Sequence, residues 1–403
     1  MTRLRLLPRF GLLPLALGLG LALPSRLAAD DAPDFKAVDA AVRRGITRGV
    51  YPGAVVVIGR SDKLLHAERY GRLTWDSRSA RPRSDSTLWD LASLTKVVAA
   101  GAAMRLIDQG LLDLDAPVRT YVSEFTGGMR DQVTVRMLLN HTSGLRPYIP
   151  FWRTASSRDE ALTQLFADPL RRVPGIAAEY SDLNAILMGL VLERASGTTL
   201  DLLLRREVLD PLAMHQTWFR PEASLWQRVA PSFMEHDAPV FGVPSDQNAV
   251  MLGGISGHAG LFATGRDLAL YAQAWLRGGM TSEGDTWVRS ETVQEFLTGS
   301  PHAGTRLLGW DTPDPEYEPP SVFGRLLSPL AYGHTGWSGT EMWIDPARDL
   351  FVVFLTNRSF DPRARNSIRA LRDIRSAVSD AAARAVPLRD GLLESSLGAT
   401  IGS

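Results

Sequence analysis

Lysine is rare in this chain, and one of its few lysines stands three residues after a serine. The lysines are Lys36, Lys63 and Lys96, and the other 41 of the 44 basic residues are arginines. Arginine stays protonated at any working pH, whereas a buried lysine can lose its proton and act as a base. The pair Ser93 and Lys96 therefore suggests a serine nucleophile with a lysine as its proton acceptor.

The segment around Ser93 is expected to be helical. Residues 90–100 read Asp-Leu-Ala-Ser-Leu-Thr-Lys-Val-Val-Ala-Ala, and the continuation to Leu106 is rich in alanine, which favours a helix starting near Ser93. Side chains three apart lie on one helix face. Backbone N–H groups at the helix start can also stabilise an oxyanion. The competing interpretation is a helix-capping serine followed by an unrelated lysine.

Two later segments carry polar groups that such a site could use. Residues 180–184 read Tyr-Ser-Asp-Leu-Asn, and residues 333–339 read Gly-His-Thr-Gly-Trp-Ser-Gly. In order and separation, the three motifs resemble those of the serine β-lactamase and penicillin-binding superfamily: Ser-x-x-Lys, Tyr-x-Asn or Ser-x-Asn, and Lys-Thr-Gly or His-Thr-Gly. The resemblance spans residues 35–385. Its class C-like branch is indicated by residues 138–145, 211–214 and 257–262.

The resemblance implies a role for each matching residue. Ser93 would be the acylated nucleophile and Lys96 would help to remove its proton. Tyr180 would share proton transfer, which requires neighbouring positive charge; a buried structural tyrosine is the alternative. The backbone N–H groups of Ser93 and Trp337 would form an oxyanion hole. The implied substrate-binding residues are Asp182, His334, Thr335 and Gly336.

Two of these positions depart from the family pattern. Asp182 stands where many relatives have Asn, and a carboxylate beside Lys96 would favour its ammonium form. His334 replaces the Lys that commonly precedes Thr-Gly, so a permanent positive charge for a substrate carboxylate would become one that depends on pH. Relatives with His-Thr-Gly include esterases and peptidases.

Three more polar residues lie in glycine-containing loops: His141, Ser143 and His258. They are expected mainly to cap helices and stabilise turns, and the alternative is that they line the cleft.

The elements that must position these residues follow from hydrophobic periodicity. A helix is expected over 34–49, strands over 53–59 and 64–70, and a mostly helical region over 93–330. Strands are expected again over 340–344 and 350–356, with a last helix over 363–386. The predicted fold class is α+β: an antiparallel sheet built from both chain ends, flanked by helices, with an inserted helical lobe.

The N-terminus predicts export. Residues 1–29 contain four arginines, no acid and an apolar run from Phe10 to Leu23 that is too short for a membrane helix. We expect a signal peptide over 1–29, a hydrolase domain over 30–386 and a flexible tail over 387–403, in a periplasmic or secreted protein. The alternative is an uncleaved anchor. No stable membrane span is expected after cleavage.

Composition narrows the partners. With 44 acidic and 44 basic residues, no net positive field attracts nucleic acid, so a nucleic-acid partner is not expected. The chain has no cysteine, which excludes a disulfide framework and a cysteine nucleophile. No metal or cofactor is expected, and the expected partner is a small-molecule or peptidoglycan-derived substrate.

The sequence thus predicts a serine hydrolase that acylates Ser93 and hydrolyses a small ester, a D-alanyl peptide or a β-lactam. The alternative is a penicillin-binding or sensing protein that acylates without efficient turnover. An α/β-hydrolase is a weaker possibility, because neither residues 254–258 nor residues 336–340 complete its Gly-x-Ser-x-Gly elbow.

Overall fold

The computed structural model describes residues 32–314, 321–360 and 367–388. The predicted signal peptide, 1–29, and the tail from 389 onward lie outside the described residues. The chain divides into Met1–Pro33 and Asp34–Ser403, and every element discussed below belongs to the second unit.

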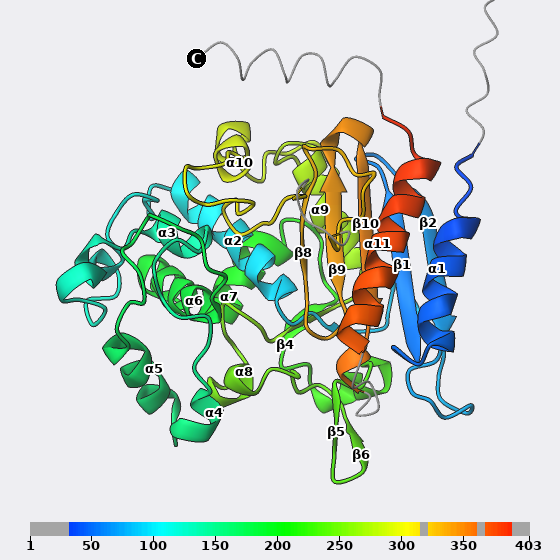
Figure 1. The fold of residues 1–403 in the computed structure, drawn as a ribbon, viewed down its shortest axis with the longest axis horizontal. Coiled ribbons are helices and arrows are strands. Elements are labelled where there is room, and N and C mark those ends of the chain that lie inside the picture. Colours follow the sequence, from blue (N-terminus) through cyan, green and yellow to red (C-terminus); the bar gives the residue numbers. More distant parts are fainter. Residues whose placement is uncertain (1–31, 315–320, 361–366, 389–403) are drawn as a thin grey trace, which may run out of the picture. The chain divides into compact units, whose positions relative to one another are not determined.

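Both ends of the second unit contribute to one five-stranded antiparallel sheet (Figure 1). Its strand order is β2-β1-β10-β9-β8. The strands are β1 (Gly53–Gly59), β2 (Leu64–Gly71), β8 (Tyr332–Thr335), β9 (Glu341–Asp345) and β10 (Leu350–Thr356). The predicted fold class is therefore confirmed, and the predicted strand ranges agree with β1, β2, β9 and β10 to within one residue.

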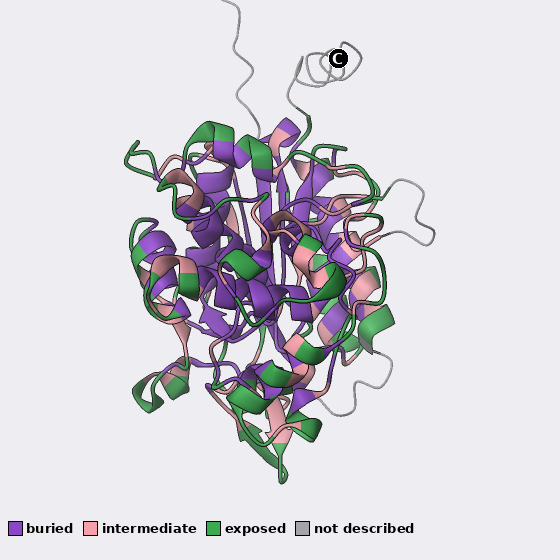
Figure 2. Ribbon diagram, turned by 90° about the vertical axis from the view of Figure 1, so that its left-hand side faces the viewer, coloured by how far each residue is buried: buried purple, intermediate pink, exposed green. Residues whose placement is uncertain are grey.

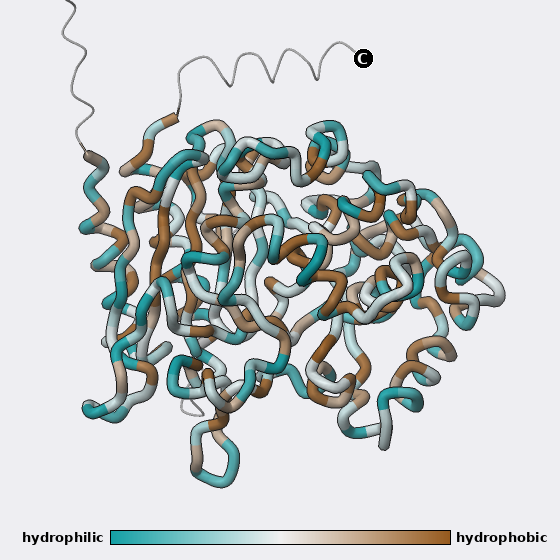
Figure 3. The backbone as a smooth tube through the Cα atoms, turned by 180° about the vertical axis from the view of Figure 1, so that it is seen from behind, coloured by the Kyte–Doolittle hydropathy of each residue, from teal (hydrophilic) through white to brown (hydrophobic). Residues whose placement is uncertain are grey.

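Strands β1 and β10 are buried on both faces of the sheet. Alternate side chains of β1 enter different cores, with Val56 and Ile58 on one face and Val55 and Val57 on the other. The first face is covered by α1 (Lys36–Thr47) and α11 (Ser367–Ala385), and the second by α9 (Gly265–Leu276). Figure 2 shows the buried strands at the centre. In Figure 3, the brown colour of the trace marks the hydrophobic residues of the sheet. Double burial explains why β1 and β10 are apolar runs rather than alternating ones.

The inserted region is mainly helical, as expected, but it also contains short strands. These strands are only two or three residues long, too short to show a period of two. They are β3 (Trp89–Asp90), β4 (Thr217–Phe219), β5 (Phe233–Glu235), β6 (Ala238–Val240) and β7 (Leu261–Ala263). The small sheet β3-β7-β4 matters for the site, because it joins Asp90 to Phe262.

Two helices of this region carry the motif residues. Helix α2 (Leu94–Asp108) is buried along most of its length, and α6 (Asp182–Ser196) packs against it. The remaining helices surround this pair: α3 (Val135–Leu139), α4 (Phe151–Thr154), α5 (Arg158–Ala167), α7 (Leu200–Leu204), α8 (Gln247–Met251) and α10 (Ser290–Phe296). Within the described ranges, no helix is both long enough and apolar enough to cross a membrane.

Candidate active site

Ser93 stands at the N-cap of α2, immediately after a strained residue. Ala92 has φ 46°, in the left-handed region that non-glycine residues rarely occupy. The buried Asp90 carboxylate holds this turn: it accepts from Ala92 N–H at 3.0 Å and from Ser245 N–H and Oγ at 2.8 and 2.7 Å. Because the Ser93 hydroxyl makes no capping bond to the helix, it is available to other groups.

Lys96 lies on α2, about one helical turn after Ser93. Its Nζ is 2.9 Å from Ser93 Oγ, 3.1 Å from the His258 carbonyl oxygen and 2.8 Å from Asp182 Oδ1, and its side chain is only 4% exposed. Burial alone would lower the pKa of Lys96, but the negative charge of Asp182 and the proximity of Tyr180 outweigh it, so the net shift of this pKa is upward. The 2.8 Å contact places Asp182 where the sequence analysis expected it to favour the ammonium form.

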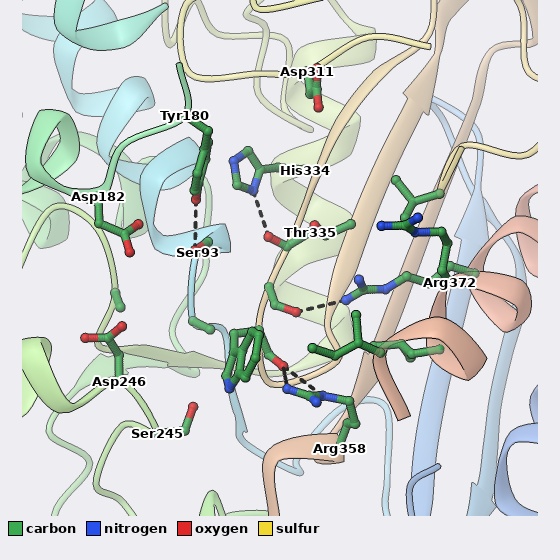
Figure 4. A pocket seen from close by; sticks show the side chains of 18 of the residues that line it. Ser93, Tyr180, Asp182, Ser245, Asp246, Asp311, His334, Thr335, Arg358 and Arg372 are labelled. Carbon is green, nitrogen blue, oxygen red and sulfur yellow. Dashed lines mark hydrogen bonds between the residues drawn. The ribbon is translucent and has the colours of Figure 1, made fainter. Parts of the chain in front are cut away.

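Tyr180 approaches Ser93 from the segment before α6. Its Oη lies 3.1 Å from Ser93 Oγ (Figure 4). Two cations flank its ring, with Lys96 Nζ 5.1 Å and the Arg306 guanidinium carbon 5.0 Å from the ring centroid. The structure therefore brings the hydroxyl, amine and phenol of the three motif residues together.

His141 and the start of α6 hold Tyr180 in place. Ser181 caps α6, and its backbone N–H donates to His141 Nδ1 at 3.2 Å. The His141 ring also packs against Tyr180, with centroids 4.7 Å apart. Burial, together with the Arg306 and Lys96 cations, lowers the pKa of His141 well below its usual value. A neutral His141 that accepts at Nδ1 has the turn-stabilising role expected from the sequence.

His334 lies on β8, in the wall of the cleft. It is buried, and its Nδ1 lies 2.9 Å from the Thr335 carbonyl oxygen. Burial and the nearby Lys96 and Arg306 cations lower the pKa of His334 well below its usual value. His334 is therefore neutral at neutral pH. The positive charge expected of it from the sequence is disfavoured by these surroundings, which the sequence motif could not reveal.

The loop after β8 is docked directly onto the turn that presents Ser93. Ser338 Oγ donates to the Asp90 carbonyl at 2.6 Å, and Thr340 Oγ1 donates to the Leu91 carbonyl at 3.0 Å. Gly336 is required here, because a Cβ would collide with Thr340 Oγ1 and would lie 2.5 Å from the Leu91 carbonyl oxygen.

Two backbone donors at this junction have no protein acceptor. Within the described parts of the chain, neither the N–H of Ser93 nor the N–H of Trp337 donates to another protein group. The Trp337 carbonyl, in contrast, accepts two bonds from Arg358, at 3.1 and 2.7 Å.

His258 supports the site through its backbone and its ring. Its carbonyl accepts from Lys96, while its Nε2 lies 3.0 Å from Asp246 Oδ1 and its Nδ1 lies 2.8 Å from Ser256 Oγ. Burial would raise the pKa of Asp246, but His258 outweighs burial and the net shift of this pKa is downward. His258 thus contacts the site and also stabilises the loop. The sequence left both possibilities open.

A cavity of about 840 Å³ opens at Ser93 (Figure 4). Asp182 and Asp246 lie on one side of Ser93, and Arg358 and Arg372 lie on the other. Of the eight predicted site residues, only Lys96 is not part of the cavity wall. Lining residues that the sequence analysis did not single out as functional are Tyr148, Trp152, Ser245, Asp246, Arg306, Asp311, Arg358, Arg372 and Arg375. They come from separate segments, and no local pattern around them could have identified them.

Among the described residues, no group of three or more His, Asp or Glu side chains is placed to hold a metal ion. The site consists of a hydroxyl, an amine, a phenol and unpaired backbone donors. Such a set can perform nucleophilic acyl transfer.

Comparison with known proteins gives consistent results. The family model described as Beta-lactamase matches residues 38–375. A protein of Escherichia coli O157:H7, provisionally named a D-alanyl-D-alanine carboxypeptidase, is 31% identical over 78% of this chain and 80% of its own. The N-acetylmuramyl-L-alanine amidase of Bacillus subtilis (strain 168) is 30% identical over 81% of this chain and 82% of its own. A solved class C beta-lactamase superposes with a TM-score of 0.70 at 22% identity, covering 88% of this chain and 98% of its own.

Proposed function

The chain belongs to the beta-lactamase family of serine hydrolases, and we propose that it acts through an acyl-enzyme on Ser93 and that a D-alanyl peptide is its substrate. The observation that carries the mechanism is the position of Ser93 Oγ, 2.9 Å from Lys96 Nζ and 3.1 Å from Tyr180 Oη at the cavity wall. Both distances lie within hydrogen-bond reach, as proton transfer requires.

In the proposed first step, Tyr180 acts as a phenolate: Ser93 Oγ attacks the carbonyl carbon of the substrate, and the Tyr180 phenolate oxygen takes the hydroxyl proton and becomes a neutral phenol. Lys96 and Arg306 supply the neighbouring positive charge that a phenolic base requires. We assign the base role to Tyr180 rather than to Lys96, because Asp182 lies 2.8 Å from the Lys96 amine and stabilises its ammonium form. Lys96 then donates a charge-assisted hydrogen bond to Ser93 Oγ.

In the tetrahedral intermediate, the former carbonyl oxygen carries the negative charge. The N–H groups of Ser93 and Trp337 would donate to it, since neither has a protein acceptor within the described residues. The intermediate collapses, the bond to the leaving amine breaks, and Tyr180 returns the proton to that amine. Water then attacks the Ser93 ester with Tyr180 again accepting the proton, which releases the acid and restores Ser93.

The substrate assignment depends on the charges of the cavity and on the curated relatives. Arg306, Arg358 and Arg372 line the cavity, and Arg306 is paired with Asp311 at 3.3 Å, so a leaving group that ends in a carboxylate would meet positive charge mainly on the side of Arg358 and Arg372. Because His334 is neutral, these arginines take over the role that the sequence gave to His334. The name of the Escherichia coli relative supports a D-alanyl-D-alanine terminus as the first substrate to test. Such a substrate agrees with the proposed periplasmic location.

Intact-mass spectrometry of the mature protein tests this proposal. The protein is mixed separately with p-nitrophenyl acetate, a fluorescent penicillin and an N-acylated peptide ending in D-alanyl-D-alanine, and adducts and products are followed over time. We expect a transient Ser93 adduct with the ester and release of D-alanine from the peptide. The same peptide ending in L-alanyl-L-alanine is the control.

The other outcomes discriminate among the remaining activities. Product from the ester alone would indicate an esterase, and rapid penicillin hydrolysis would indicate a β-lactamase. A stable penicillin adduct without turnover would favour a penicillin-binding or sensing protein, in which the ion pair of Lys96 with Asp182 would be one cause of slow deacylation. The absence of every adduct would refute the acyl-enzyme proposal.

A further inference from the structure

Arg375, on α11, contacts the loop between β8 and β9 that carries Trp337. Its side chain is buried, and its Nη2 donates to the carbonyl oxygens of Gly336 at 2.9 Å and Thr340 at 2.7 Å. These two residues close the loop between β8 and β9, because Gly336 N–H donates to the Thr340 carbonyl at 2.7 Å. One guanidinium therefore binds both ends of the turn that contains Trp337.

The same loop is attached on its other side to the residues that precede Ser93. Ser338 Oγ donates to the Asp90 carbonyl and Thr340 Oγ1 donates to the Leu91 carbonyl. The loop is thus held between α11 and the Ser93 turn. Its position relative to Ser93 depends on both attachments, and Arg375 provides the one from α11.

Glu341 is the acidic partner of the buried Arg375, and burial raises the pKa of this carboxyl to about 8. Glu341 is the first residue of β9, its side chain is 0% exposed, and its Oε2 lies 3.2 Å from Arg375 Nε. A buried guanidinium without a partner would be costly. The guanidinium is planar, so the contact of its Nε side with Glu341, which lacks hydrogen-bond geometry, leaves Nη2 facing the two carbonyls.

We propose that Arg375, oriented by Glu341, is a positioning residue that sets the Trp337 N–H at the site where the substrate oxyanion forms. The proposal rests on the acyl-enzyme mechanism proposed above. It assigns Arg375 no contact with the reacting atoms: Nη2 binds two backbone carbonyls and Nε faces Glu341.

The chain contains a matched control at the opposite end of β9. Asp345 is its last residue, and its Oδ2 lies 3.2 Å from Nε of the buried Arg348. Arg348 also donates to two backbone carbonyls, those of Val386 at 3.0 Å and Leu326 at 2.7 Å. This second pair likewise joins a buried arginine to a carboxyl group of β9, but its Asp345 also accepts from Ser328 N–H and Oγ, and it does not line the cavity.

The test compares two double variants, Arg375→Met with Glu341→Gln and Arg348→Met with Asp345→Asn. Each removes both charges of one pair, so neither leaves an unpaired buried charge. The readouts are the acylation rate with p-nitrophenyl acetate and the dissociation constant of phenylboronic acid, which forms a tetrahedral adduct with the serine. Melting temperatures measure the structural cost of each double variant.

We expect the first double variant to lose about 100-fold in acylation rate and in phenylboronic acid affinity, as when one oxyanion donor is misplaced, with KM little changed. The control should keep its rate within about threefold even where its melting temperature falls similarly. Arg375→Lys retains the charge and should recover part of the rate.

An acylation rate of the first double variant within about threefold of the control would overturn this inference. So would a fall in rate without weaker phenylboronic acid binding. If the unaltered protein itself forms no adduct, the acyl-enzyme proposal fails instead, and the two failures are distinguished by that first measurement.

Discussion

The Ser93 hydroxyl receives two short contacts that act in different ways. Lys96, buried and 2.8 Å from Asp182, is held as a cation, whereas Tyr180 lies between two cations and has no acidic partner in contact with its hydroxyl among the described residues. In the proposed mechanism, this difference assigns the proton transfer to Tyr180 and the charge-assisted hydrogen bond to Lys96. Both functions need the amine and the phenol at their present positions.

Ser93→Ala should abolish the covalent adduct with p-nitrophenyl acetate and leave the free energy of unfolding nearly unchanged. The hydroxyl makes no helix-capping bond, so its removal costs the fold little. Intact-mass spectrometry and urea unfolding give the two readouts. An adduct retained by this variant would place the nucleophile elsewhere.

Lys96→Arg should lower the acylation rate by about 100-fold or more. The side chain is 4% exposed, and its single amine is shared by Ser93, Asp182 and the His258 carbonyl. A larger planar guanidinium cannot reproduce those three directions in the same space. Stopped-flow acylation measures the effect, and activity within tenfold of the unaltered protein would contradict an essential amine.

Asp182→Asn tests the charge state of Lys96. Asp182 shifts the pKa of Lys96 upward, so its removal should lower that pKa and allow the ammonium to lose its proton at a lower pH. If the ammonium is the working form, the alkaline limb of the acylation profile moves to lower pH in the variant. If the neutral amine were the base, acylation at neutral pH would increase instead, and our assignment to Tyr180 would be wrong.

At the scale of elements, the site depends on how closely the loop after β8 approaches the N-terminal end of α2. The strained Ala92, the buried Asp90 and the side chains of Ser338 and Thr340 all lie in this contact. Such a close approach leaves no space for a side chain at Gly336.

Gly336→Ala should separate the loop from the Ser93 turn and reduce acylation by about 100-fold, with a loss of about 1–3 kcal/mol in unfolding free energy. The added Cβ would meet Thr340 Oγ1 and the Leu91 carbonyl. Gly299→Ala is the control, because a Cβ there meets nothing within 4 Å. Equal activity in the two variants would show that the close approach is not needed.

At the scale of the whole molecule, burial determines the charge of the groups around the cleft. The sheet is buried on both faces, and the site lies where one of its edge strands meets the buried helix α2. His141 and His334 are enclosed there together with the Lys96 and Arg306 cations, so both rings are kept neutral. Protonation of either ring would place a further positive charge in a poorly solvated space.

The stability of the protein should therefore fall as the pH falls below 6.5. The unfolded histidines take up protons near their ordinary pKa, whereas the lowered pKa values of His141 and His334 keep the folded forms neutral. Their contribution is present above pH 6.5 and decreases toward acid by about 1.4 kcal/mol per pH unit for a ring that stays neutral, which is about 2 kcal/mol each at pH 5.

The difference between the unaltered protein and His141→Asn with His334→Gln isolates this effect, since buried carboxyl groups titrate in both proteins. Asparagine tolerates the positive φ of residue 141, which is 61°. Urea unfolding at pH 5 and pH 7 should show a smaller loss of stability in the variant. An equal loss in both proteins would mean that the two rings are protonated in the folded state.

Much of the fold and the core of the site follow from the sequence alone. Strands β1 and β10 have the predicted bounds, because a short apolar run between polar turns is a local property. Ser93 and Lys96 face the same way because both lie on one helical turn. The very short strands β3 and β7 give no such signal, and only pairing with distant segments creates them.

The tertiary structure alone decided the charges of the site and much of the wall of its cavity. Arg306, Arg358 and Arg375 come from segments without a common motif, yet the first flanks Tyr180 and the other two hold the loop of Trp337. The motif suggested a pH-dependent charge on His334, but burial and the nearby Lys96 and Arg306 cations keep its pKa well below the usual value. The sequence determines residue types and their local spacing. The solvation and charge of the site residues depend on neighbours that only folding brings together.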